Sequence, residues 1–176
     1  NAPGASAEHT AFLANPLDFT EKGEADPLKS LINQLKTDFK HEGTFLAYNA
    51  VFEQSVLKAL ATAYPDDADF IYQLTERFVD LMDVFQAGWY YTPAMQGSYS
   101  IKYVLPALFP ELSYDNLAIG NGTDSSNTFL SMILGSFTGN ETLTRKQLLD
   151  YCEQDTYAMV LLHKELIRVS YPDTDE

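Results

Sequence analysis

The chain has 176 residues, of which 45% are hydrophobic and 13% aromatic, enough apolar side chain for one compact domain. This composition excludes a disordered or collagen-like protein. The 25 acidic and 11 basic side chains give a net charge of -14, which repels a nucleic-acid backbone and argues against a protein that coats DNA. An enzyme that holds one strand end through bound divalent cations stays compatible with this charge, because the cations supply the positive charge.

The cysteine and histidine content restricts the chemistry further. Cys152 is the single cysteine, which excludes an internal disulfide framework and favours a reducing, cytoplasmic location. The three histidines, His9, His41 and His163, are too far apart in sequence to suggest a zinc site. We expect no membrane anchor and no signal peptide, because the chain has neither a spanning apolar run nor a basic N-terminal segment followed by an apolar one.

The first regular element predicted along the chain is an amphipathic helix. Residues 1–25 contain scattered Pro and Gly and predict no regular element. Asp26 is a candidate N-cap, and Pro27 suits the first turn of a helix whose apolar positions recur until Gly43 ends the pattern.

The next segment predicts a buried strand followed by two helices and a second strand. Residues 44–48 are nearly continuously apolar, which is typical of a strand buried on both faces. Asn49 is expected to cap a helix that ends near Pro65, and a further helix should start at Asp66 or Asp67. Residues 79–85 then predict another buried strand.

The second half of the chain predicts three more helices. A short one is expected over residues 100–105, and another over residues 125–135. The last should run from Thr144 to about Val169, opened by a capping box of Thr144 with Gln147. The alternating order of helices and strands favours an α/β domain with a central sheet covered by helices.

Two acidic positions are candidates for chemistry. Glu53 lies in the first turn after the first strand, over the sheet edge where ligands bind in open α/β sheets, although a charge that complements the helix dipole is the simpler explanation. Tyr151 and Asp155 are four residues apart on the last helix, along one edge of its predicted buried stripe, where an acidic residue is often only solvated. That stripe consists of Leu148, Leu149, Cys152, Thr156, Met159, Val160, His163, Leu166 and Ile167.

The pairing of these two segments resembles a known enzyme family. Tyr48–Glu53 (YNAVFE), followed about a hundred residues later by Tyr151–Asp155 (YCEQD), resembles the second and third motifs of the DEDD-type 3'-5' exonucleases, in the tyrosine branch that includes proofreading exonucleases. Residues 97–106 and 148–156 also look like an uncharacterised bacterial branch of that superfamily. The resemblance extends over residues 26–169.

The resemblance implies an RNase H-like fold, a three-layer domain with a mixed central sheet flanked by helices. It implies that Glu53, where the family normally has Asp, and Asp155 hold Mg²⁺ or Mn²⁺ for phosphodiester hydrolysis at a DNA or RNA 3' end. Tyr151 would orient the attacking water or help to deprotonate it. Asn49 and Lys102 would bind substrate, the lysine by neutralising a phosphate.

The family's first motif, an acidic D-x-E pair on an opening strand, is absent from this sequence. Asp18 and Glu21 are the nearest candidates, but their spacing is wrong and Pro16 and Gly23 favour a loop. Because the chain also does not begin with Met, we expect residues 1–176 to be one exonuclease-like domain whose first strands lie upstream, in a longer protein with other domains. This chain alone should be weakly active or inactive. The alternative is a non-catalytic module that keeps the exonuclease fold and binds protein or nucleic acid as a scaffold.

Several other residues have two interpretations that the sequence leaves open. Asp80 and Asp83 either contribute to the acidic cleft or are solvated at the edge of a strand. Four aromatic residues in the loop-rich middle either stack on unpaired bases or pack in the core: Trp89, Tyr90, Tyr91 and Tyr99.

Overall fold

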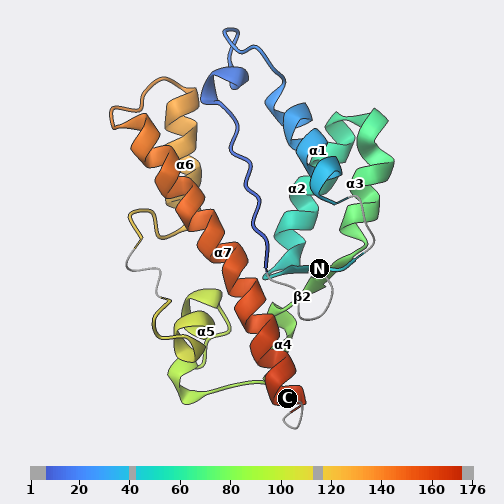
Figure 1. Cartoon of the computed structure of the whole chain (residues 1–176), viewed down its shortest axis with the longest axis vertical. Helices are drawn as coiled ribbons and strands as arrows, with labels where there is room; N and C mark the ends of the chain where they lie inside the picture. The colour runs from blue at the N-terminus through green and yellow to red at the C-terminus, as the bar shows by residue number, and fades with distance from the viewer. Residues whose placement is uncertain (1–6, 40–42, 113–116, 172–176) are drawn as a thin grey trace.

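The computed structural model describes residues 7–39, 43–112 and 117–171, so His41 lies outside the described residues. These residues form a mostly helical α/β fold with a small parallel sheet (Figure 1). The helices and strands in chain order are α1 (Pro27–Asp38), β1 (Phe45–Ala47), α2 (Ala50–Ala63), α3 (Ala68–Thr75), β2 (Phe78–Asp80), α4 (Met82–Gln86), α5 (Ile101–Leu108), α6 (Gly122–Ile133) and α7 (Glu141–Ser170). The short 3-10 helices are η1 (Pro16–Phe19), η2 (Pro65–Asp67) and η3 (Pro93–Met95).

The start of α1 follows from its local sequence. The Asp26 carboxylate accepts hydrogen bonds from the backbone N–H groups of Leu28 and Lys29, each at 3.0 Å. Pro27 occupies the first helical position, where its missing N–H costs nothing. The predicted cap is therefore confirmed.

The sheet is smaller than the sequence suggests. β1 pairs in parallel with β2, and Phe45 lies opposite Phe78 and Ala47 opposite Asp80. A strand is confirmed within residues 44–48, but of its residues only Ala47 is buried, so burial on both faces is not confirmed. The second strand prediction, over 79–85, is wrong beyond Asp80. Among the described residues the sheet is limited to these two strands, so it is small and parallel, and the mixed central sheet of an RNase H-like domain is not shown.

The second strand ends early because the residues after it pack as a helix. The Asp80 side chain accepts a hydrogen bond from the Met82 N–H at 3.0 Å, which turns the chain into α4. Leu81 and Phe85, four residues apart, then enter the same buried cluster. A short apolar run fits either a strand or a helix, so periodicity alone did not distinguish them.

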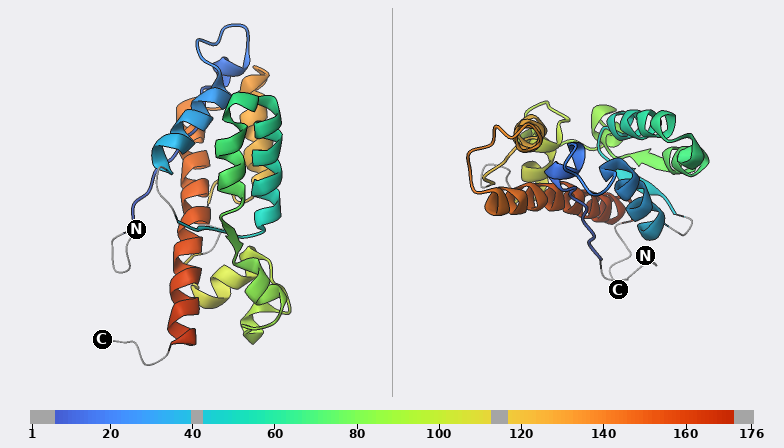
Figure 2. Two further views of the ribbon diagram at one scale, coloured as in Figure 1. Left: turned by 90° about the vertical axis from the view of Figure 1, so that its right-hand side faces the viewer. Right: turned by 90° about the horizontal axis from the view of Figure 1, so that it is seen from above.

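The long helix α7 extends along most of the length of the molecule (Figure 2). It begins at Glu141, three residues before the predicted start, because the Asn140 side chain accepts a hydrogen bond from the Leu143 N–H at 3.0 Å and so provides the cap. Arg145 fixes the N-terminal segment to this helix. Its guanidinium donates to the carbonyl oxygens of Leu13 at 3.0 Å and Ala14 at 2.8 Å.

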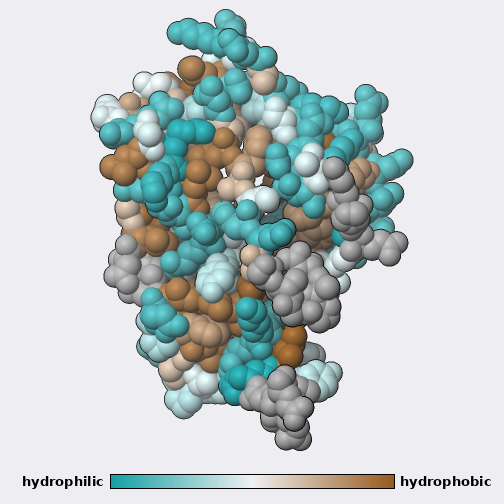
Figure 3. All heavy atoms as spheres, viewed as in Figure 1, coloured by the Kyte–Doolittle hydropathy of each residue, from teal (hydrophilic) through white to brown (hydrophobic). Residues whose placement is uncertain are grey.

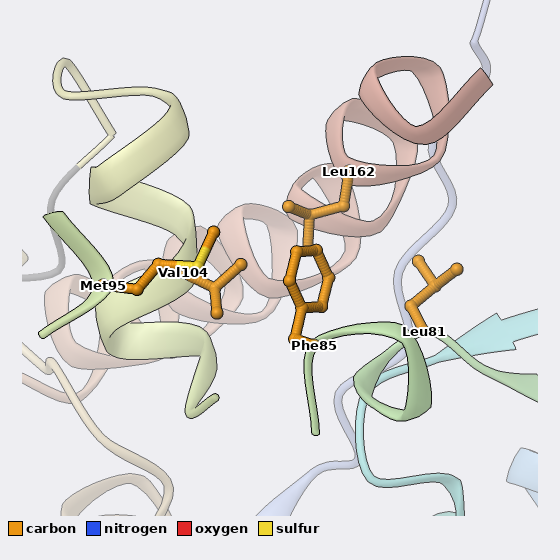
Figure 4. Close-up of a cluster of buried hydrophobic side chains, with 5 residues drawn as sticks. All are labelled: Leu81, Phe85, Met95, Val104 and Leu162. Atoms are coloured by element: carbon orange, nitrogen blue, oxygen red, sulfur yellow. The ribbon is translucent and has the colours of Figure 1, made fainter. Parts of the chain in front are cut away.

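The apolar core is divided into separate clusters, three of which include a residue of α7. Leu162 packs against Phe85 and Val104 in one cluster (Figure 4). Ala158 packs against Leu105 in a second. The third consists of Leu148, Ile119 and Met132. A further cluster joins the first three helices and consists of Ile32, Leu60, Ala61 and Ile71.

The buried face of α7 differs in phase from the predicted stripe. The residues buried on it are Leu148, Ala158 and Leu162. Four residues expected on the stripe are exposed instead: Cys152, Thr156, His163 and Ile167. Apolar residues occur all around α7 between 159 and 162, so the period alone left its rotation ambiguous, and contact with α5 decides it.

An ion cluster joins α1 to the segment before α3. Asp67 is buried and accepts hydrogen bonds from the ammonium groups of Lys29 and Lys36, the latter at 2.7 Å. Elsewhere apolar side chains reach the surface in patches that hydrophilic residues separate (Figure 3). None of the helices in the described ranges has the length and apolar content needed to cross a bilayer.

Candidate functional site

A cavity of about 350 Å³ lies between β1, α2, α5 and α7. Four of the five predicted site residues line it: Glu53, Lys102, Tyr151 and Asp155. The fifth, Asn49, follows Tyr48, which also lines the cavity. The fold therefore brings together residues that are far apart in the sequence. Most of the remaining lining is apolar and comes from Leu35, Phe39, Phe45, Leu46, Ala47, Leu57, Leu74, Phe78, Ile101 and Met159.

Asp80, and not Asn49, caps the helix that carries Glu53. Asn49 adopts a left-handed conformation, with φ of 69°, and its side chain makes no capping hydrogen bond, so the predicted cap is wrong. The Asp80 carboxylate instead accepts hydrogen bonds from the backbone N–H groups of Asn49 at 2.9 Å and Ala50 at 2.8 Å. A side chain from the neighbouring strand thus fixes the start of α2, and with it the position of Glu53 one turn later.

The Glu53 carboxylate lies in an environment that disfavours its negative charge. Its Oε2 atom is buried and has no hydrogen-bond partner among the described residues. Burial raises the pKa of Glu53, and the negative charges of Asp80 and Asp155 raise it further, while a hydrogen bond to its own backbone lowers it. A cation in the cavity would offset both the desolvation and the repulsion.

Tyr151 and Asp155 lie together on the inner side of α7. Both are partly buried, and they occupy the stretch of the helix between Leu148 and Ala158. Burial raises the pKa of the Tyr151 phenol, and the charge of Asp155 and a hydrogen bond with its carboxylate raise it further. The phenol is therefore a hydrogen-bond donor at neutral pH. A Cβ added to Gly122, the first residue of α6, would lie 3.8 Å from its hydroxyl oxygen, so α6 begins close to this group.

Lys102 contributes a positive charge to the cavity. It is exposed, lies in the first turn of α5, and forms no salt bridge with another described residue. The Tyr48 hydroxyl donates to the carbonyl oxygen of Tyr99 at 2.6 Å, which attaches the segment before α5 to the end of β1. Lys102 thus lines the same cavity as Glu53 and Asp155, and no carboxylate among the described residues pairs with it.

The carboxylates available to a metal ion are few. In the parts of the chain that the structure describes, no three His, Cys, Asp or Glu side chains form a group that could hold a metal ion. Glu53 and Asp155 both line the cavity. Asp80 is close enough to raise the pKa of Glu53, but its oxygens are engaged by backbone N–H groups. Two carboxylates thus remain as candidate ligands.

A family model described as a domain of unknown function, DUF2779, matches residues 1–100. The chain belongs to the DUF2779 family. The match to DUF2779 includes Asn49 and Glu53 but ends before Lys102, Tyr151 and Asp155. Comparison with curated proteins and with solved structures finds no match. Family membership supplies neither a superfamily nor an activity, so a function for this DUF2779 chain has to come from the chemistry of the site.

Sequence reasoning missed the structural role of Asp80. The residue was recognised as either part of an acidic cleft or solvated, and neither interpretation includes capping of a helix across the sheet. An acidic residue at the end of one parallel strand, opposite a strand that runs into a helix, is the signal that would have suggested it. The capping is visible only once Ala47 and Asp80 are known to be paired.

Of the aromatic residues in the middle of the chain, most are exposed. Trp89, Tyr91 and Tyr99 have large accessible areas. Tyr90 is partly buried, and its hydroxyl donates to Glu165 at 2.8 Å. Tyr90 therefore belongs to the packed structure, whereas the other three remain available for binding.

Glu53→Gln should raise the free energy of unfolding at neutral pH by less than about 1 kcal/mol, because it removes a partly buried charge that desolvation and the carboxylates of Asp80 and Asp155 disfavour. Urea titration of the metal-free protein measures this. The gain should vanish as the pH falls below 4.5, because Glu53 is then protonated in the folded and the unfolded states alike. Glu111→Gln, at an exposed position, is the matched control and should change stability little. A destabilised Glu53→Gln variant would contradict this account of the site.

Proposed function

We propose that this DUF2779 domain is a metal-dependent nuclease domain of the 3'-5' exonuclease type, which hydrolyses phosphodiester bonds in DNA or RNA. The observation that carries the proposal is the convergence of Glu53, Tyr151 and Asp155 on one cavity from two helices. These residues lie in the two segments that resemble the second and third exonuclease motifs. A shared cavity is what a common catalytic role requires, and motif spacing alone does not provide one.

The residues present fit a hard divalent cation. Glu53 and Asp155 would hold Mg²⁺ or Mn²⁺, which prefer carboxylate oxygens, and the buried Oε2 of Glu53 lacks any other partner among the described residues. A bound ion of this kind supplies Lewis acidity toward the phosphodiester and lowers the pKa of a coordinated water. The longer side chain of Glu53, compared with the usual Asp, displaces its carboxylate by one methylene.

The other residues of the cavity position the substrate. Lys102 would bind a phosphate oxygen, since no described carboxylate neutralises it. Tyr151, held protonated by burial and by its hydrogen bond to Asp155, would accept a hydrogen bond from the attacking water through its hydroxyl oxygen and so orient it, and would not act as a base. Asn49 makes no capping bond with its side chain, which leaves the amide for substrate.

We extend the proposal to the sheet. A two-stranded sheet with three residues in each strand is marginal by itself, and among the described residues β1 pairs with β2 on one side and with no strand on the other. In a parallel pair, alternate residues direct their backbone groups away from the partner, so those of Leu46 are directed to the free edge. A further strand that carries the D-x-E pair would add to this edge, beside the apolar part of the cavity. It would complete an RNase H-like sheet and supply the missing carboxylates.

Digestion of 5'-labelled single-stranded DNA and RNA in Mn²⁺ tests the nuclease proposal. The assay compares this chain with a longer one that includes the acidic strand. We expect the longer chain to shorten both substrates stepwise from the 3' end and this chain to be weak, with no digestion in chelator. Shortening from the 5' end, or undiminished digestion in chelator, would overturn the proposal.

One observation favours a second candidate function, a non-catalytic scaffold with the exonuclease fold. It is the lack of any group of three metal ligands among the described residues. Calorimetry with Mn²⁺ separates the two functions. The nuclease proposal expects weak binding to this chain, with a Kd of about 1 mM, and tighter binding to the longer chain. Heats no larger than the dilution control for both chains would favour the scaffold.

A further inference from the structure

An open groove lies beside the cavity, at the start of α5. Its volume is about 530 Å³, and we call it the tyrosine groove. Tyr99 and Tyr103 are each 45% exposed, so a large part of each ring is accessible to a ligand. The residues that line the groove are Gln96, Gly97, Ser98, Tyr99, Ser100 and Tyr103.

The backbone of the groove is held in a defined shape. Gln96 and Gly97 are both left-handed, with φ of 53° and 75°. This conformation is uncommon for a residue other than glycine and persists when surrounding contacts determine it. The preceding Met95 is buried in the core, and its carbonyl accepts from the Ser98 N–H at 2.9 Å. The groove is therefore anchored and is not a freely moving loop.

The tyrosine groove and the cavity share one wall. Ile101 and Lys102 line the cavity, whereas Ser100 and Tyr103, on either side of them in the sequence, line the groove. The hydrogen bond from Tyr48 to the carbonyl of Tyr99 joins the two sites from the cavity side. A ligand that extends past Lys102 out of the cavity would thus reach the groove next.

We infer that the tyrosine groove binds an unpaired nucleotide of the substrate, next to the one held in the cavity, by stacking on Tyr99 and Tyr103. The inference rests on the proposed function and specifies its substrate as single-stranded nucleic acid. Stacking suits a chain with a net charge of -14, because it needs no array of cations along the phosphates. The polar lining from Gln96 and the two serines favours a nucleotide over a purely apolar ligand.

Binding of a fluorescent single-stranded oligothymidine of about ten nucleotides tests this, measured by anisotropy in chelator so that no hydrolysis occurs. Tyr99→Ala and Tyr103→Ala should each raise the Kd about tenfold, and the two Phe variants should bind like the wild type. The ratio of each alanine variant's Kd to the wild-type Kd should be the same at low and high salt, because no lysine or arginine lines the groove. Tyr72→Ala is the matched control, since Tyr72 is 44% exposed on the distant α3.

The possible outcomes separate this inference from the nuclease proposal. Unchanged affinity in both Ala variants, with melting temperatures like the wild type, overturns nucleotide binding at the groove even if the domain digests DNA. A loss of affinity in the Ala variants, with melting temperatures like the wild type, supports nucleotide binding at the groove even if no digestion is found. Equal affinity for a duplex of the same sequence, or binding of a proline-rich peptide in place of the oligonucleotide, also overturns it.

Discussion

Asp155→Asn should lower the Mn²⁺-dependent digestion rate of the longer DUF2779 chain at least about a hundredfold. Loss of a residue that only hydrogen-bonds to a metal ligand costs up to about a hundredfold, and loss of the proposed metal ligand itself should cost more. The amide keeps the size of the side chain but removes the negative charge that would hold a cation. It also weakens the acceptor that fixes the Tyr151 hydroxyl. Initial rates on 5'-labelled single-stranded DNA measure the effect.

The same helix offers a matched control for this substitution. Asp150 is paired with Lys146 at 2.6 Å on the surface of α7, and its side chain is 43% exposed. Asp150→Asn should leave the rate within about twofold of the wild type, since exposed pairs of this kind contribute little. Equal rates for the wild type and Asp155→Asn would exclude Asp155 from catalysis. They would also overturn a catalytic site formed by residues of α2 and α7.

Asp80→Ala should lower the free energy of unfolding by about 3 kcal/mol, because one carboxylate accepts hydrogen bonds from three backbone N–H groups. Two of these bonds cap α2, and the third, from Met82, starts α4. Relief of the repulsion on Glu53 offsets part of the loss. Urea titration measures the change, and the metal-free protein is the form to use.

Two further variants test the interpretation of Asp80. Asp83→Ala removes an exposed carboxylate from the first turn of α4 and should cost less than about 0.5 kcal/mol. Asp80→Asn keeps one acceptor oxygen, so its stability should fall between the wild type and the alanine variant. An alanine variant as stable as the Asp83 control would show that water replaces the cap at no cost.

Local sequence predicted the elements whose ends are determined by neighbouring residues. Asp26 caps α1 by reaching two and three residues forward, a contact that the sequence pattern specifies. At Asn49 the same reasoning was wrong, because the capping oxygen comes from Asp80. Since the pairing of β1 with β2 brings that group close, no local pattern contains the information.

The sequence predicted which residues lie together at the candidate site, whereas their functional roles stay predictions and the shape of the surrounding surface could not be predicted. The motif resemblance indicated Glu53 and Asp155, and the structure places both on one cavity. The exposure of Cys152 and His163 could not be predicted, because the rotation of α7 depends on contacts with α5 and the loops near it. The tyrosine groove was also hidden, since its shape depends on two consecutive left-handed residues.

The three clusters along α7 have a consequence for folding cooperativity. Leu148, Ala158 and Leu162 each belong to a different cluster, and one continuous helix joins all three. Opening one cluster would fray α7 and weaken the next, so these regions should exchange their amide hydrogens with similar protection. Tyr151 and Asp155 lie between the first and the second of these anchors. Their spacing should therefore persist until the whole domain unfolds.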